Sequence, residues 1–79
     1  MCRLIYWTDG NPLYPKIERA WMNGEQRITM VTSRLLRPSA IAIDFHMYDR
    51  VYFADFKLGI IESMKADGSQ RVIIARRGE

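Results

Sequence analysis

The sequence is short of the residues on which most catalytic and metal sites depend. Its 79 residues include one cysteine, Cys2, and one histidine, His46. A single cysteine forms no disulfide within the chain, and neither residue has a partner at metal-ligand spacing. No Gly-x-Ser-x-Gly motif is present to hold a nucleophilic serine. We therefore expect no enzyme activity, no metal site and no cofactor in this segment.

Long apolar runs are also missing. A membrane-spanning helix needs about 20 consecutive apolar residues, and no stretch here approaches that length. Residues 1–6 lead directly into a repeated motif without the apolar core of a signal peptide, so we expect any export signal to lie outside this sequence. No Asn-x-Ser/Thr sequon occurs, and the sequence therefore carries no independent sign of secretion.

The chain carries little excess charge of either sign. Twelve Lys and Arg residues against nine Asp and Glu residues give a net charge of +3. Nucleic-acid-binding proteins usually gather basic residues on one face, with stacking aromatics between them. The nearest clusters here are Arg34 with Arg37 and Arg76 with Arg77. Solvated loop charges are the favoured interpretation and an acidic-partner patch is the alternative; we expect no nucleic-acid partner and no membrane insertion.

What the sequence does contain is an internal repeat. The segment Leu4–Asp9 returns as Arg50–Asp55 after 46 residues. Beyond these segments the spacing is 44, and the two-residue difference falls in the loop Gly10–Pro15. The shorter spacing holds for Ile17-Glu18 with Ile61-Glu62, Asn23-Gly24 with Asp67-Gly68, and Gln26-Arg27 with Gln70-Arg71. Matched motifs with a length change confined to a Gly/Pro loop indicate duplicated units, and the period is in the range of propeller blades.

Each unit has the pattern of short strands separated by turns. Asn23-Gly24 is the preferred pair for a type I′ hairpin turn, and Asp67-Gly68 predicts a second hairpin turn. Ala40 and Ala42 share one face of a strand, which is typical of a position where another sheet approaches closely. Pro38 marks the start of that strand. The expected strands are residues 3–9, 16–22, 27–31, 39–45, 50–55, 60–65 and 71–75.

The strand pattern predicts an all-β fold that is a fragment of a β-propeller. Pro38 to Ala75 gives four consecutive antiparallel strands, and three strands precede them. A meander that is apolar on both faces needs a further sheet on each side, as in a propeller blade. We expect residues 1–35 to form strands 2–4 of a partial blade and residues 36–79 a complete blade. The alternative is a complete small β protein or a two-sheet sandwich.

Four separated motifs resemble the low-density lipoprotein receptor class B repeat, also called the YWTD repeat. They are Tyr6-Trp7-Thr8-Asp9, Ile17-Glu18-Arg19-Ala20, Asn23-Gly24 with Arg27, and the run from Pro38 to Asp44. The resemblance covers nearly the whole chain and is densest for the giant, megalin-like LDL-receptor-related proteins. It implies blades of a six-bladed β-propeller. The sequence departs from the family pattern at four positions: Gly10, Ser39, Phe53 and Ala54.

The resemblance also implies a function and a set of partners. The chain resembles segments of extracellular endocytic receptors, which are membrane glycoproteins of the cell surface and endosomes. The expected partners are protein ligands, neighbouring propeller blades and EGF-like modules of the parent chain. A nidogen-type basement-membrane protein and a non-functional truncated product are the alternatives. In acidic endosomes His46 would be a candidate pH sensor. A lactonase-like hydrolase is disfavoured because the inner strand Ser39–Asp44 offers mainly Ala and Ile.

The site residues divide into a structural set and a ligand-binding set. In the structural set, the aromatics supply area to packing between blades and the aspartates accept backbone hydrogen bonds at strand ends. This set is Tyr6, Trp7, Asp9, Tyr52, Phe53 and Asp55. Successive turns of a meander alternate between two rims, so the loops 10–15, 32–37 and 56–59 share one rim. Aromatic and arginine side chains dominate binding hot spots, and the candidates on this rim are Tyr14, Arg34, Arg37, Phe56 and Lys57.

Overall fold

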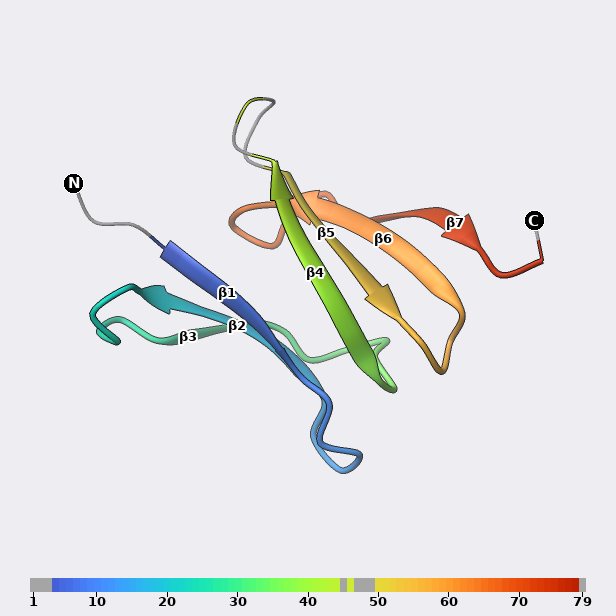
Figure 1. The fold of residues 1–79 in the computed structure, drawn as a ribbon, viewed down its shortest axis with the longest axis horizontal. Coiled ribbons are helices and arrows are strands. Elements are labelled where there is room, and N and C mark those ends of the chain that lie inside the picture. Colours follow the sequence, from blue (N-terminus) through green and yellow to red (C-terminus); the bar gives the residue numbers. More distant parts are fainter. Residues whose placement is uncertain (1–3, 45, 47–49, 79) are drawn as a thin grey trace.

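The computed structural model describes residues 4–44, 46 and 50–78, which form two antiparallel sheets (Figure 1). The first sheet has the strand order β1-β2-β3 and the second has the order β4-β5-β6-β7. Each sheet is a meander in chain order, so the predicted all-β fold of three plus four strands is confirmed. The strands are β1 (Leu4–Asp9), β2 (Lys16–Trp21), β3 (Ile28–Val31), β4 (Pro38–Asp44), β5 (Arg50–Asp55), β6 (Ile60–Lys65) and β7 (Val72–Arg76).

Most observed strand ends lie within one residue of those expected from sequence. Pro38, which was predicted to mark the start of this strand, pairs with Asp55 and is the first residue of β4. β3 and β7 each begin one residue later than predicted, and β7 extends to Arg76. Arg3 and Phe45, which were assigned to strand ends, lie outside the described residues, as do Cys2 and Asp49. Within the described part of the chain there is no helix long and apolar enough to cross a membrane.

The repeat extends to irregularities of the sheets that sequence reasoning did not anticipate. The pairing of β2 with β3 shifts register between Ile17 and Glu18, and the pairing of β6 with β7 shifts between Ile61 and Glu62. These two sites are 44 residues apart, at the spacing of the sequence repeat. An extra residue at such a site increases the local twist of a strand. The β2–β3 and β6–β7 pairings are therefore irregular at equivalent positions of the repeat.

The hairpin turns differ from the type I′ prediction. The Gly24 amide donates to the Trp21 carbonyl at 2.8 Å, so Asn23 is the third residue of the turn and Gly24 is the fourth. Gly24 has a φ of 88°, but Asn23 does not have the positive φ that a type I′ turn needs at both central positions. Gln26 also has a positive φ of 56°, and Gly68 and Gln70 repeat this pattern at 89° and 52°. The Trp21 amide donates to the Glu25 carbonyl at 2.9 Å and the Lys65 amide to the Ser69 carbonyl at 2.8 Å, so each connection has three residues and ends on a left-handed glycine.

The core lies between the two sheets, where β1 packs beside β4 (Figure 1). Side chains alternate between the two faces of a strand, so Val51 and Phe53 of β5 point toward the first sheet and are buried. Tyr6, Met30, Ile41 and Ile43 pack against the edge of this cluster. Its buried members are Ile17, Val31, Leu35, Val51, Phe53 and Met64.

The small side chains of β4 have a different environment from the one predicted. Ala40 and Ala42 are exposed, whereas Ile41 between them is turned toward the core. No second sheet approaches the alanine face among the described residues. Instead the two alanines line a shallow depression with Tyr52, Ala54 and Ile61. This face of the second sheet is therefore apolar and accessible to solvent.

Candidate functional site

Asp55 holds three segments of one rim together. Its carboxylate accepts hydrogen bonds from the backbone amides of Leu36 at 2.7 Å and Arg37 at 3.0 Å, in the connection between the sheets. It also accepts bonds from the amides of Lys57 at 3.0 Å and Leu58 at 2.9 Å, in the β5–β6 turn. The Asp55 side chain thus accepts hydrogen bonds from four backbone amides. Asp55 therefore fixes the backbone of the connection relative to the turn.

The electrostatics of Asp55 follow from this geometry. Burial by itself would raise the pKa of the carboxyl group, because it disfavours the charged form. The hydrogen bonds from the Leu58, Leu36, Arg37 and Lys57 amides outweigh that effect and lower the pKa below its ordinary value. Asp55 is only 1% exposed and is charged at neutral pH. It stabilises the rim as a buried anion surrounded by amide donors.

Arg71 holds the same connection from a second point. Its guanidinium donates to the Ser33 carbonyl at 2.7 Å and to the Arg34 carbonyl at 3.0 Å. It also forms a bidentate ion pair with the buried Glu62, at 2.8 Å for both bonds. The guanidinium carbon lies 5.4 Å from the centre of the Phe53 ring, within the range of a cation–π contact. Residues 33–37 are thus bound by a cation at one end and an anion at the other.

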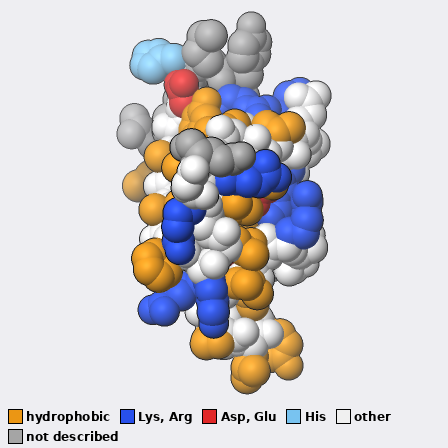
Figure 2. Space-filling view, turned by 90° about the vertical axis from the view of Figure 1, so that its right-hand side faces the viewer, with side chains coloured by type: hydrophobic (Ala, Val, Ile, Leu, Met, Phe, Trp, Pro, Cys, Tyr) orange, Lys and Arg blue, Asp and Glu red, His pale blue; other side chains and the backbone are white. Residues whose placement is uncertain are grey.

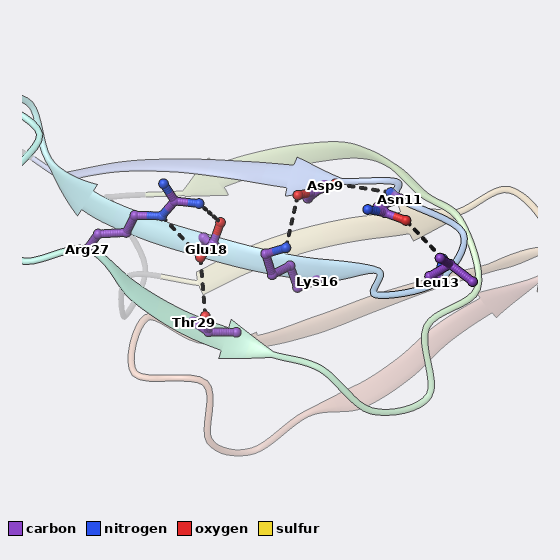
Figure 3. Close-up of polar contacts among 7 residues, drawn as sticks. All are labelled: Asp9, Asn11, Leu13, Lys16, Glu18, Arg27 and Thr29. Carbon is purple, nitrogen blue, oxygen red and sulfur yellow. Dashed lines mark hydrogen bonds and ion pairs between the residues drawn. The ribbon is translucent and has the colours of Figure 1, made fainter.

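The first sheet carries the equivalent polar side chains in a more open arrangement (Figure 3). Arg27 forms a bidentate pair with Glu18, and Thr29 adds a hydrogen bond to the same carboxylate at 3.2 Å. The Arg27 guanidinium carbon lies 5.5 Å from the centre of the Trp7 ring. The hydrogen bond from Arg27 is the main cause that lowers the pKa of Glu18. Arg27 nevertheless has a side chain that is 60% exposed, against 8% for Arg71.

Asp9 is the counterpart of Asp55 at the end of β1. It accepts a hydrogen bond from the Asn11 amide at 3.0 Å and forms an ion pair with the Lys16 ammonium group at 3.0 Å (Figure 3). These two interactions lower the pKa of the carboxyl group, with the Asn11 bond as the larger cause. Asp9 thus accepts a hydrogen bond from one backbone amide, in place of the four that Asp55 has.

Three loops converge at the rim that Asp55 organises. Gly10 and Pro12 from the β1–β2 loop, Leu36 and Arg37 from the connection, and Lys57 from the β5–β6 turn line a depression of about 340 Å³. The expectation that these loops share one rim is confirmed. The depression combines apolar surface with two cationic side chains. It is suited to a ligand that has both acidic and apolar groups.

The structure separates the predicted ligand-binding residues into four places. Arg37 and Lys57 line the depression together. Phe56 is exposed beside it, and the Arg77 guanidinium carbon lies 5.4 Å from the centre of the Phe56 ring. Tyr14 is 72% exposed in the β1–β2 loop. Arg34 has a φ of 55° and offers its carbonyl to Arg71. Neither Tyr14 nor Arg34 is among the residues that line the depression.

Sequence reasoning missed two residues of this rim, Leu36 and Arg77. Leu36 is 49% exposed and lines the depression. Arg77 donates to the Phe56 carbonyl and covers the Phe56 ring. The 44-residue spacing contained a signal for Arg77, because it matches Arg77 with Ser33 of the connection. Nothing comparable marks Leu36, whose exposure follows from its neighbour Leu35 taking the buried position.

The rim and the adjoining surface are rich in cations. Figure 2 shows the side of the molecule that carries β7, where Lys and Arg side chains are interspersed with apolar ones and little acidic surface is visible. The exposed apolar residues of β7 include Val72 and Ile74, and Arg76 follows them. Of the two motif aspartates at this rim, Asp55 is buried and bonded to amides, and Asp9 is paired with the Lys16 ammonium group. This surface therefore favours an acidic partner.

His46 lies away from this rim, next to the end of β4. It is exposed, and its backbone amide donates to the Asp44 carboxylate at 2.9 Å. No group of three or more His, Cys, Asp or Glu side chains is arranged to hold a metal ion in the part of the chain that the structure describes.

The repeated strands and the hydrogen-bonded aspartates at their ends are features that can be compared with those of known protein families. The model of the low-density lipoprotein receptor repeat class B matches residues 3–45, more than half of the chain. The chain belongs to this family. Its second sheet repeats the same motif outside the matched range, as the shared spacing and the shared polar contacts show.

The chain is similar to parts of larger proteins. It is 35% identical to protein cueball of Drosophila grimshawi over 94% of its length, and 37% identical to the vitellogenin receptor Yl of Drosophila melanogaster over 86%. It covers only 13% and 3% of those proteins. A chain in the crystal structure of a nidogen/laminin complex superposes with a TM-score of 0.85 at 33% identity, over 95% of this chain and 27% of that one. The propeller-type fold is therefore confirmed.

Proposed function

We propose that this chain is an extracellular protein-binding and spacer segment of an LDL-receptor-related endocytic receptor, with a non-enzymatic role. Residues 1–35 and 36–79 are its two blade units, and the ligand contacts the rim organised by Asp55. The observation that carries the proposal is the depression between three loops, which combines Leu36 with the cations Arg37 and Lys57. The similarity to a vitellogenin receptor supports the receptor class. The megalin-like branch rests on the sequence motifs alone.

The ligand class follows from the chemistry of the rim. Arg37 and Lys57 attract carboxylates, and Leu36 and Phe56 offer apolar surface that is exposed to water. Aromatic and arginine side chains contribute most to hot spots in protein interfaces. A protein segment with acidic and apolar side chains fits this combination. The expected affinity depends on salt, because ions screen interactions between exposed charges.

A selection with a displayed random-peptide library tests the proposal. We expect the peptides retained by the chain to be rich in Asp and Glu, and their affinity to fall at least about tenfold for the double variant Arg37→Glu, Lys57→Glu, which corresponds to about 1.4 kcal/mol. The single variant Lys57→Glu has a matched control in Lys65→Glu, which makes the same charge reversal on an exposed residue at the other end of β6. Neutral peptides, or equal losses in the control, would contradict the proposed rim.

A matrix role of the nidogen type is the second candidate, favoured by the likeness to the chain from the nidogen/laminin complex. Purified laminin distinguishes it. Saturable binding of laminin that the Arg37→Glu, Lys57→Glu variant loses would support the matrix role on the same rim. Peptide binding without laminin binding would support the receptor role.

A further inference from the structure

We propose that Asn23 is a site of spontaneous covalent modification, at which water converts the side-chain amide to a carboxylate through a cyclic imide formed with the backbone nitrogen of Gly24. The other product is ammonia. The site lies in the β2–β3 turn, at the opposite end of the strands from the rim that Asp55 organises (Figure 1). It is therefore independent of the ligand-binding role proposed for that rim.

The reaction has two steps and needs no reagent other than water. In the first, the Gly24 nitrogen loses its proton and attacks Asn23 Cγ, an approach favoured because both groups belong to the same chain segment. The new N–Cγ bond closes the imide, and the Cγ–Nδ2 bond breaks to release the nitrogen as ammonia, which takes up the lost proton.

The second step opens the imide at either of its two carbonyl carbons. The water oxygen adds to that carbon and ends in a new carboxylate, and a proton of the water returns to the Gly24 nitrogen. Breaking the bond from this nitrogen to Asn23 Cγ gives aspartate in a normal backbone. Breaking its bond to the backbone carbonyl carbon of Asn23 gives isoaspartate, in which the backbone runs through the side chain.

Sequence context confines this reaction to one of the two asparagines in the chain. Asn11 precedes Pro12, whose ring nitrogen has no proton to lose. Asn23 precedes Gly24, which has no Cβ to obstruct the attack. A Cβ placed on Gly24 meets no atom within 4 Å in the described part of the chain, so the space beside the nucleophile is open. Asn23 and Gly24 are both exposed, and water therefore reaches the imide.

The exposure of Asn23 does not depend on whether a further sheet packs against the first. Asp67 occupies the equivalent position at the 44-residue spacing. The first sheet does lie against that second turn, because Tyr6 and Arg19 donate to the Ala66 carbonyl at 3.5 and 2.8 Å. Asp67 is nevertheless exposed. A sheet packed on the neighbouring residue therefore leaves this position open to water.

The hydrogen bonds of the β2–β3 turn act on the reaction in two opposing ways. The Glu25 amide donates to Asn23 Oδ1 at 2.9 Å, which polarises the carbonyl group that is attacked. The Gly24 amide donates to the Trp21 carbonyl at 2.8 Å, which retains the proton that has to leave. The Gly24–Trp21 bond must therefore open before the imide forms. Local opening of an exposed turn is a low-energy event compared with unfolding, so the folded turn slows the reaction without preventing it.

The second unit shows that the aspartate product fits the turn. Asp67 Oδ1 accepts a hydrogen bond from the Ser69 amide at 2.9 Å, and the Gly68 amide donates to the Lys65 carbonyl at 2.8 Å. The first turn makes both contacts at the same distances. The reaction at Asn23 thus gives the first turn the carboxylate that the second turn has in its sequence.

Isoaspartate has no such counterpart. The additional backbone carbon moves the Gly24 amide away from the Trp21 carbonyl and lengthens the connection between β2 and β3. Arg27 follows this connection and forms a bidentate pair with Glu18 of β2. The isoaspartate form therefore strains or loses that ion pair, whereas the aspartate form retains it.

Mass spectrometry of the purified chain after incubation at neutral and mildly alkaline pH provides the test. Tryptic cleavage after Arg19 and Arg27 isolates residues 20–27, and fragment masses distinguish Asn23 from Gln26. We expect loss of the amide nitrogen at Asn23, faster at the higher pH because the deprotonated nitrogen is the nucleophile. Asn11 in the same sample is the internal control and should keep its amide. Equal loss at Asn11, or loss at Gln26 in place of Asn23, overturns the proposal.

A parallel sample unfolded in urea measures the effect of the turn. The folded chain should react about two- to tenfold more slowly than the unfolded chain, the factor that one hydrogen bond of ordinary net strength contributes. Equal rates would show that the Gly24–Trp21 bond imposes no restraint. An Asn23 amide that persists in the folded chain after the unfolded chain is fully converted would show that the folded turn is not a modification site.

Two variants of this exposed turn test the products. Asn23→Asp should unfold at the same urea concentration as the unmodified chain, and the isoaspartate form, separated by ion exchange, should unfold at a lower one. Asn23→Gln has to close a larger ring and should keep its amide over the same period. A loss of stability in Asn23→Asp as large as that of the isoaspartate form would contradict the correspondence with Asp67.

Discussion

The two sheets present nearly the same side chains in two different environments. The Glu62–Arg71 pair of the second sheet is buried, bonds to the backbone of residues 33–34 and lies over Phe53. The Glu18–Arg27 pair of the first sheet has the same bidentate geometry and lies over Trp7, but its arginine is mostly exposed. Asp55 and Asp9 differ in the same way. The difference shows that each motif makes the same contacts within its own sheet, and that in the second sheet the segment packed against it adds further contacts and excludes water.

This comparison predicts that the second copy of each motif contributes more to the free energy of unfolding than the first copy does. A buried ion pair is costly to break, because its remaining partner keeps an uncompensated charge. A partly exposed pair loses little, because water replaces the missing partner. Matched substitutions in the two sheets therefore test the comparison directly. Urea-induced unfolding followed by circular dichroism measures each of them.

The largest contrast is expected for the glutamates. Glu62→Ala leaves the Arg71 guanidinium buried without its anion and should lower the free energy of unfolding by about 3–5 kcal/mol. Glu18→Ala frees an arginine that already reaches water, and its loss should be less than half as large. Equal losses for the two variants would show that the ion pairs act within their own sheets.

The aspartates form the next contrast. Asp55→Asn retains one acceptor oxygen but turns an amide group toward backbone donors, and we expect a loss of about 2–3 kcal/mol in the free energy of unfolding. Asp9→Asn removes an acceptor that is bonded to one amide and one lysine, so its effect should be clearly smaller. The comparison fails if Asp9→Asn is the more destabilising change.

The pH dependence of stability should reflect Asp55. Its pKa is lower in the folded state than in the unfolded state, so its stabilising contribution is complete above about pH 4, the ordinary pKa region of aspartate. That contribution is lost as the pH falls through the lower folded pKa. Stability measured by urea unfolding from pH 7 downward should decline more steeply for the wild-type chain than for Asp55→Asn. Parallel curves would show that Asp55 does not contribute to this decline.

The smallest contrast concerns the hairpin glycines. Gly24 and Gly68 have nearly the same positive φ, and substitution by Ala at such a position should cost about 1 kcal/mol. A Cβ at Gly24 meets no atom within 4 Å, whereas one at Gly68 lies 3.4 Å from Met30. Gly68→Ala should therefore be the more destabilising by a few tenths of a kcal/mol. The reverse order would indicate that Met30 adapts without cost.

Much of the fold was predictable because it depends on local patterns. Alternation of side chains located the strands, and the spacing of 44 and 46 residues located the duplicated turns and the rim loops. The turn type was wrong, because Asn23-Gly24 also fits a three-residue connection in which the glycine is left-handed and the asparagine is not. The exposure of Ala40 and Ala42 was also missed. Small side chains predict that a sheet can approach, but not that one does.

The candidate site was predicted in part for the same reason. Arg37, Phe56 and Lys57 were found from their positions in loops, and Arg37 and Lys57 do line one depression. Tyr14 and Arg34 share the same loops without sharing the depression. Leu36 and Arg77 were missed because their placement depends on which neighbour enters the core and on a contact between distant segments.

The sequence by itself determined the repeat: its period, its seven strands among the described residues, its turn positions and the side chains offered by each face. These properties follow from local backbone preferences and the two-residue period of a strand. Only the tertiary structure decided which copy of each motif is buried. Trp7 and Phe53 occupy equivalent positions, yet their exposure depends on whether another sheet covers them. Whether a side chain is buried depends on the residues packed against it, and residues distant in sequence are brought together only by folding.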